Sequence, residues 1–137
     1  MSIQPTHSVA APHVLVRDCM HPGVLTCGPG DSLQHVAEIM ANHRVHAVVI
    51  MNPSANRAVG VVSDMDIVAA LAAGADCSAR EAAATEPLTV LADESLAGAA
   101  QRMNEHGVSH LLVLDSAGGR PIGVLSTLDI AAAYARD

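Results

Sequence analysis

The 137-residue chain has no lysine, no phenylalanine and no tryptophan, and Tyr134 is its one tyrosine. Seven arginines, scattered along the sequence, carry all the fixed positive charge, and the formal net charge is −7. A nucleic-acid-binding protein needs clustered cations to neutralise phosphates, and aromatic side chains if it is to stack on single-stranded bases. The sequence offers neither feature, so we expect no nucleic-acid partner.

Long apolar runs and signal-like features are also missing. The longest stretch without charged or polar residues, Ile67 to Ala75, is far too short to span a bilayer. The N-terminal sequence MSIQPTHSVAAPH has neither the basic start nor the apolar stretch of a signal peptide. The three cysteines, Cys19, Cys27 and Cys77, are odd in number and lack a Cys-x-x-Cys spacing. We therefore expect free thiols, no membrane partner and a cytoplasmic protein.

What the chain does contain is an internal duplication. The sequence GVVSDMDIVAAL at Gly60 to Leu71 returns as GVLSTLDIAAAY at Gly123 to Tyr134. With an offset of 63 residues, the two halves align without a gap from residue 17 to residue 136. Such a register indicates one duplicated unit. We predict a flexible N-terminal tail over residues 1–12, a first domain over residues 13–75 and a second domain over residues 76–137.

Each half shows the pattern β-α-β-β-α, which predicts an α/β (α+β) fold. Apolar residues at helical spacing follow Ser32 and Ser95, and further helices are predicted after Ser63, Ser78 and Ser126. A unit of about 60 residues is marginally stable alone. We expect the two units to pack sheet to sheet around a common core, with pseudo-twofold symmetry and two related clefts between the halves. The predicted strands are 24–27, 47–51, 59–62, 88–91, 110–114 and 122–125.

The repeated Ser-x-x-Asp allows two interpretations. Ser63 and Asp66, like Ser126 and Asp129, have the spacing of a capping box at a strand-to-helix turn, which is a purely structural role. The same geometry suits a nucleotide, because a helix start attracts phosphate and a carboxylate there can accept both hydroxyls of a ribose. The spacing alone leaves both interpretations open.

In both halves, these motifs occur in an order that resembles CBS domains. Each half contains, in this order, an opening Thr, a Ser-Leu before an amphipathic helix, a Val-rich strand and a Gly-h-h-Ser-x-x-Asp-Ile segment, where h is an apolar residue. The two halves are VRDCMHPGVLTCGPGDSLQHVAEIMANHRVHAVVIMNPSANRAVGVVSDMDIVAAL and AREAAATEPLTVLADESLAGAAQRMNEHGVSHLLVLDSAGGRPIGVLSTLDIAAAYA. The whole chain resembles the small stand-alone CBS-pair proteins of bacteria. The resemblance implies a tandem CBS pair, or Bateman module. It would sense an adenosine-containing ligand in the inter-domain clefts and associate as a homodimer.

The resemblance also implies roles for particular residues. Asp66 and Asp129 would hold ribose, and Ser63 and Ser126 would lie at ribose or phosphate. Thr26 and Thr89, with Cys27 and Val90 beside them, would line the base end, and the segments Val45-His46-Ala47 and Val108-Ser109-His110 would face the base. The regulatory ligand would be AMP, ADP, ATP or S-adenosylmethionine, with no obligatory cofactor, no catalytic residue, and an unidentified effector protein as partner.

The sequence departs from the family at two places. Ala47-Val48 and His110-Leu111 stand where the family often has a proline. Where some nucleotide-binding members have a basic residue after the Ser, this chain has Asp64 and Thr127. Asp64 would repel a phosphate, so we expect the cleft with Ser126, Thr127 and Asp129 to be the better nucleotide site. Phosphate neutralisation would fall to Arg44, Arg57, Arg102, Arg120 or a protonated histidine.

Two alternatives remain open. One is a metal or redox sensor, since the chain has eight histidines and the close pairs His43/His46, His106/His110 and Cys19/His21. Those histidines fall at helix ends, where interaction with the helix dipole also explains them. The other is a structural subunit with empty clefts, which self-associates through the Ala-rich helices 64–73 and 127–135. No nucleophile elbow or phosphate loop occurs, so we do not expect an enzyme.

Overall fold

The computed structural model describes residues 8–11, 13–54, 57–83, 87–117 and 119–136. The chain folds as two compact units, and each is described by itself. The continuous unit spans Val24–Pro87, and the discontinuous unit combines Met1–Gly23 with Leu88–Asp137. Residues 13–23, which precede the first repeat's opening strand, thus pack with the second half of the chain.

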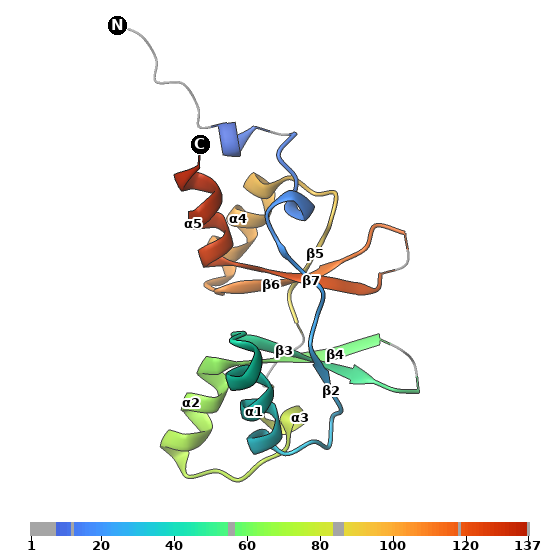
Figure 1. Cartoon of the computed structure of the whole chain (residues 1–137), viewed down its shortest axis with the longest axis vertical. Coiled ribbons are helices and arrows are strands. Elements are labelled where there is room, and N and C mark those ends of the chain that lie inside the picture. The colour runs from blue at the N-terminus through green and yellow to red at the C-terminus, as the bar shows by residue number, and fades with distance from the viewer. Residues whose placement is uncertain (1–7, 12, 55–56, 84–86, 118, 137) are drawn as a thin grey trace, which may run out of the picture. The chain divides into compact units, whose positions relative to one another are not determined.

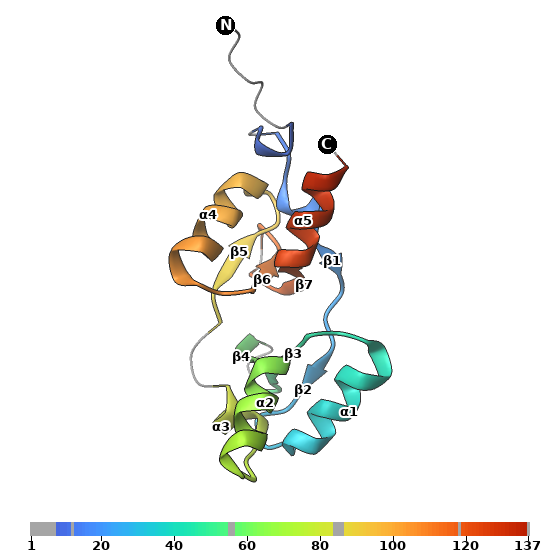
Figure 2. The same cartoon turned by 90° about the vertical axis from the view of Figure 1, so that its left-hand side faces the viewer.

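The continuous unit contains β2 (Thr26–Cys27), α1 (Leu33–His43), β3 (Ala47–Asn52), β4 (Arg57–Ser63), α2 (Asp64–Ala73) and α3 (Ala79–Ala82). Its sheet has the order β2-β3-β4, in which β2 and β3 are parallel while β3 and β4 are antiparallel. The helices cover one face of this sheet (Figures 1 and 2). Apolar side chains of the helices and strands form its core, including Val36, Met40, Val48, Ile50 and Val62.

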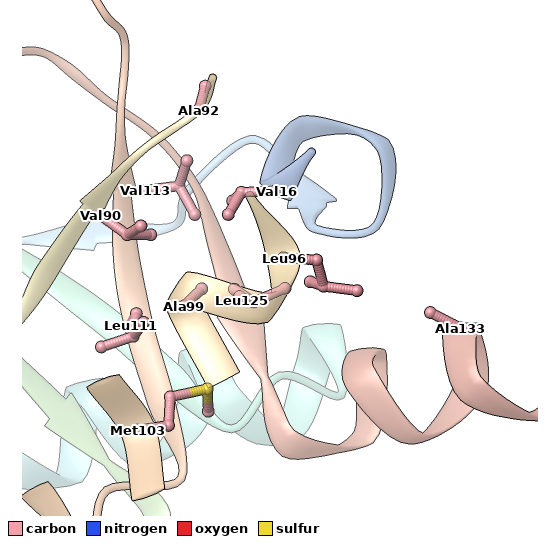
Figure 3. Packing of buried hydrophobic residues seen from close by; sticks show 10 residues of the cluster. All are labelled: Val16, Val90, Ala92, Leu96, Ala99, Met103, Leu111, Val113, Leu125 and Ala133. Atoms are coloured by element: carbon pink, nitrogen blue, oxygen red, sulfur yellow. The ribbon is translucent and has the colours of Figure 1, made fainter. Parts of the chain in front are cut away.

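The discontinuous unit contains β1 (His21–Pro22), β5 (Thr89–Leu91), α4 (Leu96–His106), β6 (His110–Leu114), β7 (Pro121–Ser126) and α5 (Thr127–Ala135). Its sheet has the order β1-β7-β6-β5, so the N-terminal strand pairs with the last strand of the chain. Figure 3 shows the core of this unit, where Val16 from the N-terminal segment joins side chains such as Leu96, Leu111 and Leu125. A segment distant in sequence therefore completes this core.

The two long helices begin and end at equivalent positions of the repeat. The hydroxyl oxygens of Ser32 and Ser95 accept from the amides of His35 and Gly98, each at 3.1 Å, as N-caps do. α1 ends at Arg44, which takes the left-handed conformation with φ 54°. α4 ends 63 residues later at Gly107, with φ 64°, where glycine avoids the steric cost that a side chain meets.

The structure confirms the predicted α+β fold and the predicted β-α-β-β-α order in both halves. It also shows three features that the sequence did not predict. β1 is an additional strand, Ser8–Ala10 form a short 3-10 helix against α4 within the expected tail, and the buried residues form one cluster in each unit. None of the helices in the described part of the chain has the length and apolarity needed to cross a membrane.

Candidate ligand-binding site

In both units, a strand leads directly into a helix through the repeated Ser-x-x-Asp. Ser63 ends β4 and caps α2, and Ser126 ends β7 and caps α5. Asp66 Oδ2 accepts from the backbone amide of Ser63 at 2.8 Å, and Asp129 Oδ2 accepts from that of Ser126, also at 2.8 Å. In return each serine hydroxyl accepts from the amide of its aspartate. The predicted capping boxes therefore exist, and each uses only one oxygen of its carboxylate.

The second carboxylate oxygen differs between the units. Among the described residues, Asp66 Oδ1 has no hydrogen-bond partner, and the Asp66 side chain is half-buried. Asp129 Oδ1 lies 2.6 Å from Nδ1 of His21, whose side chain is 77% exposed while that of Asp129 is 5% exposed. The repeated motif thus presents one available carboxylate oxygen and one that a histidine already occupies.

The backbone places the predicted base-facing segments beside these helix starts. Ala47 on β3 pairs with Ser63, and His110 on β6 pairs with Ser126. The Asp64 amide donates to the His46 carbonyl at 3.0 Å, and the Thr127 amide donates to the Ser109 carbonyl at 2.9 Å. Each unit thereby brings its Ser-x-x-Asp together with its segment 45–47 or 108–110.

The opening threonines lie farther along the same sheets. Thr26 on β2 pairs with Val49, and Thr89 on β5 pairs with Leu112, in each case two residues beyond the position opposite the capping serine. The Thr89 carbonyl accepts from Arg102 at 2.7 Å, and Arg102 also contacts Glu94 at 3.3 Å. Arg102 is therefore engaged within its own unit.

Positive charge for a phosphate is limited at both helix starts. Asp64 follows the first capping serine and contacts His46 Nδ1 at 2.9 Å, with both side chains exposed. Arg120 lies 3.8 Å from Asp115. Arg44 and Arg57 are exposed and form no ion pair within the described residues. Two of the four arginines considered for phosphate binding, Arg102 and Arg120, are therefore already paired with acidic side chains.

The backbone amides at the helix starts are also largely occupied. The amides of the serine cap, of the first helical residue and of the aspartate all have partners in both units. The amides of Met65 and Leu128, which remain in this turn, bond to no side chain or loop carbonyl among the described residues. A phosphate group would find at most one free amide per helix, which is far fewer than a phosphate-binding loop provides.

A pocket of about 330 Å³ opens within the discontinuous unit. It lies between α4 and the start of α5, and Val108 and Thr127 from the predicted set line it. Its other lining residues include Met103 and Ile130, whereas Ser126 and Asp129 are not among them. Thr127 and Asp129 thus lie on different sides of the first turn of α5.

Burial and backbone contacts describe one of the cysteines and two of the histidines considered for a metal or redox sensor. Burial, together with the smaller effect of the negative charge of Asp31, raises the pKa of the Cys27 thiol from 9.0 to about 11. His43 and His106 end their helices, and each donates from Nδ1 to the carbonyl four residues earlier, at 3.0 and 2.9 Å. Among the residues that the structure describes, no three His, Cys, Asp or Glu side chains are arranged to hold a metal.

The duplicated sequence and its two capped strand-to-helix turns correspond to a known family. The family model described as "CBS domain" matches residues 16–73 and again residues 79–136. The chain belongs to the CBS domain family. As a CBS pair, it is similar to solved structures over nearly its whole length.

Three similar structures, each at least 25% identical to this chain, show the extent of the match. The CBS domain pair of protein MJ0100, in complex with 5′-methylthioadenosine and S-adenosyl-L-methionine, has a TM-score of 0.82 and 25% identity over 91% of this chain and 98% of that chain. CBS domain protein PAE2072 from Pyrobaculum aerophilum, complexed with AMP, has a TM-score of 0.77 and 28% identity, covering 90% and 100%. Hypoxic Response Protein I, with two coordinated zinc ions, has a TM-score of 0.71 and 29% identity, covering 87% and 98%.

Curated relatives match the same CBS part of the chain. Homoserine O-acetyltransferase from Methanococcoides burtonii is 34% identical over 119 residues, and that from Methanohalophilus mahii is 33% identical over 120 residues. These matches cover 86% and 88% of this chain. The chain spans about a quarter of the length of each relative, since the match covers 24% of both.

His21 is the site residue that sequence reasoning missed as a neighbour of Asp129. The sequence indicates only its closeness to Cys19. The equivalent residue in the second repeat, 63 positions later, is Ala84, so comparison of the two repeats does not indicate a role for His21. The contact arises because β1 pairs with β7, a long-range pairing that no local pattern announces.

Proposed function

We propose that this CBS pair is a non-catalytic regulatory module that binds an adenosine-containing ligand through Asp66 and Asp129. The observation that carries the proposal is the second carboxylate oxygen of Asp66, which is left over after the helix cap is complete. A carboxylate in this position can accept hydrogen bonds from the hydroxyls of a ribose. The MJ0100 pair with its methylthioadenosine and S-adenosylmethionine, and PAE2072 with its AMP, support an adenosine-type ligand.

The ligand is recognised as a nucleoside more than as a polyphosphate. The scarcity of free amides at the helix starts, the carboxylate of Asp64 and the absence of lysine all disfavour a chain of phosphates. Thr26 and Thr89 with the segments 45–47 and 108–110 would line the base. AMP or S-adenosylmethionine therefore fits this surface better than ATP does.

Isothermal titration of AMP, ATP and S-adenosylmethionine tests the proposal. We expect AMP or S-adenosylmethionine to bind, and ATP to bind no more tightly than AMP. The variants Asp66→Asn and Asp129→Asn keep an acceptor for the capping amide but lose the carboxylate, so each should weaken binding. Asp76→Asn is the matched control, because Asp76 is exposed and lies outside both capping boxes. No binding of any of the three ligands would refute the proposal.

The pair is also proposed to form a homodimer. Met65 and Leu71 on α2 are 65% and 82% exposed, and the equivalent Leu128 and Tyr134 on α5 are 66% and 55% exposed. Large apolar side chains at matched positions of both repeats are typical of a surface that associates. Light scattering at micromolar concentration should give a dimer, and Leu71→Glu with Tyr134→Glu should give a monomer. A monomeric unmodified protein would contradict this assembly.

Regulation requires that the ligand favour one arrangement of the protein over another. CBS domains match nearly the whole of this sequence, so the signal would pass to an effector protein or to a domain outside it. The curated relatives support this role, since a segment similar to this pair makes up about a quarter of an acetyltransferase. Hydrogen exchange with and without AMP would identify the surface that changes.

A further inference from the structure

His21 lies at a position that sets the two repeated sites apart. Its imidazole Nδ1 is 2.6 Å from Asp129 Oδ1, and the other oxygen of Asp129 already accepts from the Ser126 amide. Both oxygens of this carboxylate are therefore engaged inside the discontinuous unit. Because a carboxylate oxygen accepts hydrogen bonds, Nδ1 of His21 is the donor in this contact.

The backbone holds His21 in this position. β1 pairs antiparallel with β7, where His21 lies opposite Val124 and Pro22 lies opposite Gly123. The amide of Gly23 donates to the carbonyl of Ile122 at 2.7 Å. A Cβ built on Gly123 would lie 2.5 Å from the His21 carbonyl oxygen, closer than real Cβ atoms approach, so glycine is needed for β1 to lie this close. The strand therefore presents the imidazole to the start of α5.

The other repeat lacks this feature. The residue equivalent to His21 is Ala84, whose methyl group cannot donate a hydrogen bond. Asp66 Oδ1 has no partner among the described residues, whereas Ser63 and Asp66 reproduce the cap of Ser126 and Asp129. Two helix starts with the same cap thus differ in whether a ribose can reach the second carboxylate oxygen directly.

We propose that His21 is a specificity-determining residue which directs the nucleoside to the Asp66 site, because a ribose reaches Asp129 only after the imidazole has moved away. This inference rests on the proposed function, and it opposes the expectation that the Asp129 site is the better one. The His21 side chain is 77% exposed, so it can rotate into water without opening the core. Its displacement costs the nucleoside part of its binding free energy at that site.

Site-resolved NMR titration with AMP tests this inference. The backbone amides of Ser63 and Ser126 each donate to the carboxylate in question, so each reports on its own site in the same sample. In the unmodified protein the Ser63 resonance should respond at lower AMP concentration than that of Ser126. In His21→Ala, the Ser126 midpoint should fall by roughly 3- to 10-fold, the range for a partly exposed charge-assisted contact, while the Ser63 midpoint stays the same.

His106→Ala is the matched control, because it removes an imidazole of the same unit that donates to a helix carbonyl and not to Asp129. Both midpoints should be unchanged in that variant. Two results would overturn the inference and leave the proposed function intact. One is an unchanged Ser126 midpoint in His21→Ala, and the other is an unmodified protein in which the Ser126 site already binds AMP more tightly than the Ser63 site. No response of either amide in any of the proteins would overturn both.

Discussion

Replacing Asp129 by alanine and by asparagine separates the structural role of the repeated Ser-x-x-Asp from its proposed binding role. Asp129 is 6% exposed, and its Oδ2 is the acceptor for the Ser126 amide at 2.8 Å. Alanine removes that acceptor and leaves a half-buried amide unpaired. Asparagine has nearly the same shape and keeps an oxygen for the amide, but it loses the negative charge at the helix start and the charged partner of His21.

The magnitudes follow from these contacts. The hydroxyl of Ser126 still caps the backbone amide of residue 129 in both variants, so the loss in the alanine variant is the unsatisfied, partly buried amide of Ser126, which costs about 1–3 kcal/mol. Loss of the charge near the N-terminus of α5 costs about 0.3–1 kcal/mol. We therefore expect Asp129→Ala to lower the free energy of unfolding by about 1–4 kcal/mol, and Asp129→Asn to lower it by about 1 kcal/mol or less.

Urea unfolding monitored by circular dichroism measures this difference, and AMP titration at the Ser126 amide measures binding on the same proteins. Both variants should lose binding at that amide to a similar extent, because neither has the carboxylate. Equal destabilisation by alanine and asparagine would refute the reasoning about the cap. Normal AMP binding by Asp129→Asn would refute the ribose role and leave Ser126 and Asp129 as a capping box alone.

Three further predictions concern single positions. Arg44→Gly should raise the free energy of unfolding, measured with urea, by about 0.5–1 kcal/mol. The reason is that Arg44 has the left-handed φ of 54°, which is sterically unfavourable for arginine but not for the glycine at the equivalent position, Gly107. An unchanged or lower stability would contradict this. Gly123→Ala should displace β1 and weaken the contact of His21 with Asp129, which is measured as a loss of protection from hydrogen exchange at Gly23. Gly60→Ala should perturb the continuous unit less, because its new Cβ would meet only side-chain atoms, at 3.3 Å. Equal effects of the two variants would contradict the argument from the close approach of β1. Cys27 should react slowly with a thiol reagent at pH 9, because its pKa is raised to about 11. The stability that the protonated thiol contributes to the folded protein should be lost as the pH rises from 9 to 11. Rapid labelling of the folded protein at pH 9 would contradict the buried position of Cys27.

The sequence by itself determined the features that depend on neighbouring residues or on the repeat. The offset of 63 residues predicted two equivalent units, and helical spacing after Ser32 and Ser95 predicted α1 and α4. The spacing of Ser63 to Asp66 and of Ser126 to Asp129 predicted the capping boxes that the structure contains. These signals are local, because a helix start is decided by hydrogen bonds within about four residues.

Only the tertiary structure decided how the two repeats differ. The pairing of β1 with β7 assigns the N-terminal segment to the unit formed by the second half, and it places His21 on Asp129. That pairing joins residues about a hundred positions apart in the chain, and it depends on the missing side chain of Gly123 and on the burial of Val16 in the core of that unit. Neither contact has a period or a spacing to detect, so a sequence that repeats itself can still form two sites with different neighbours.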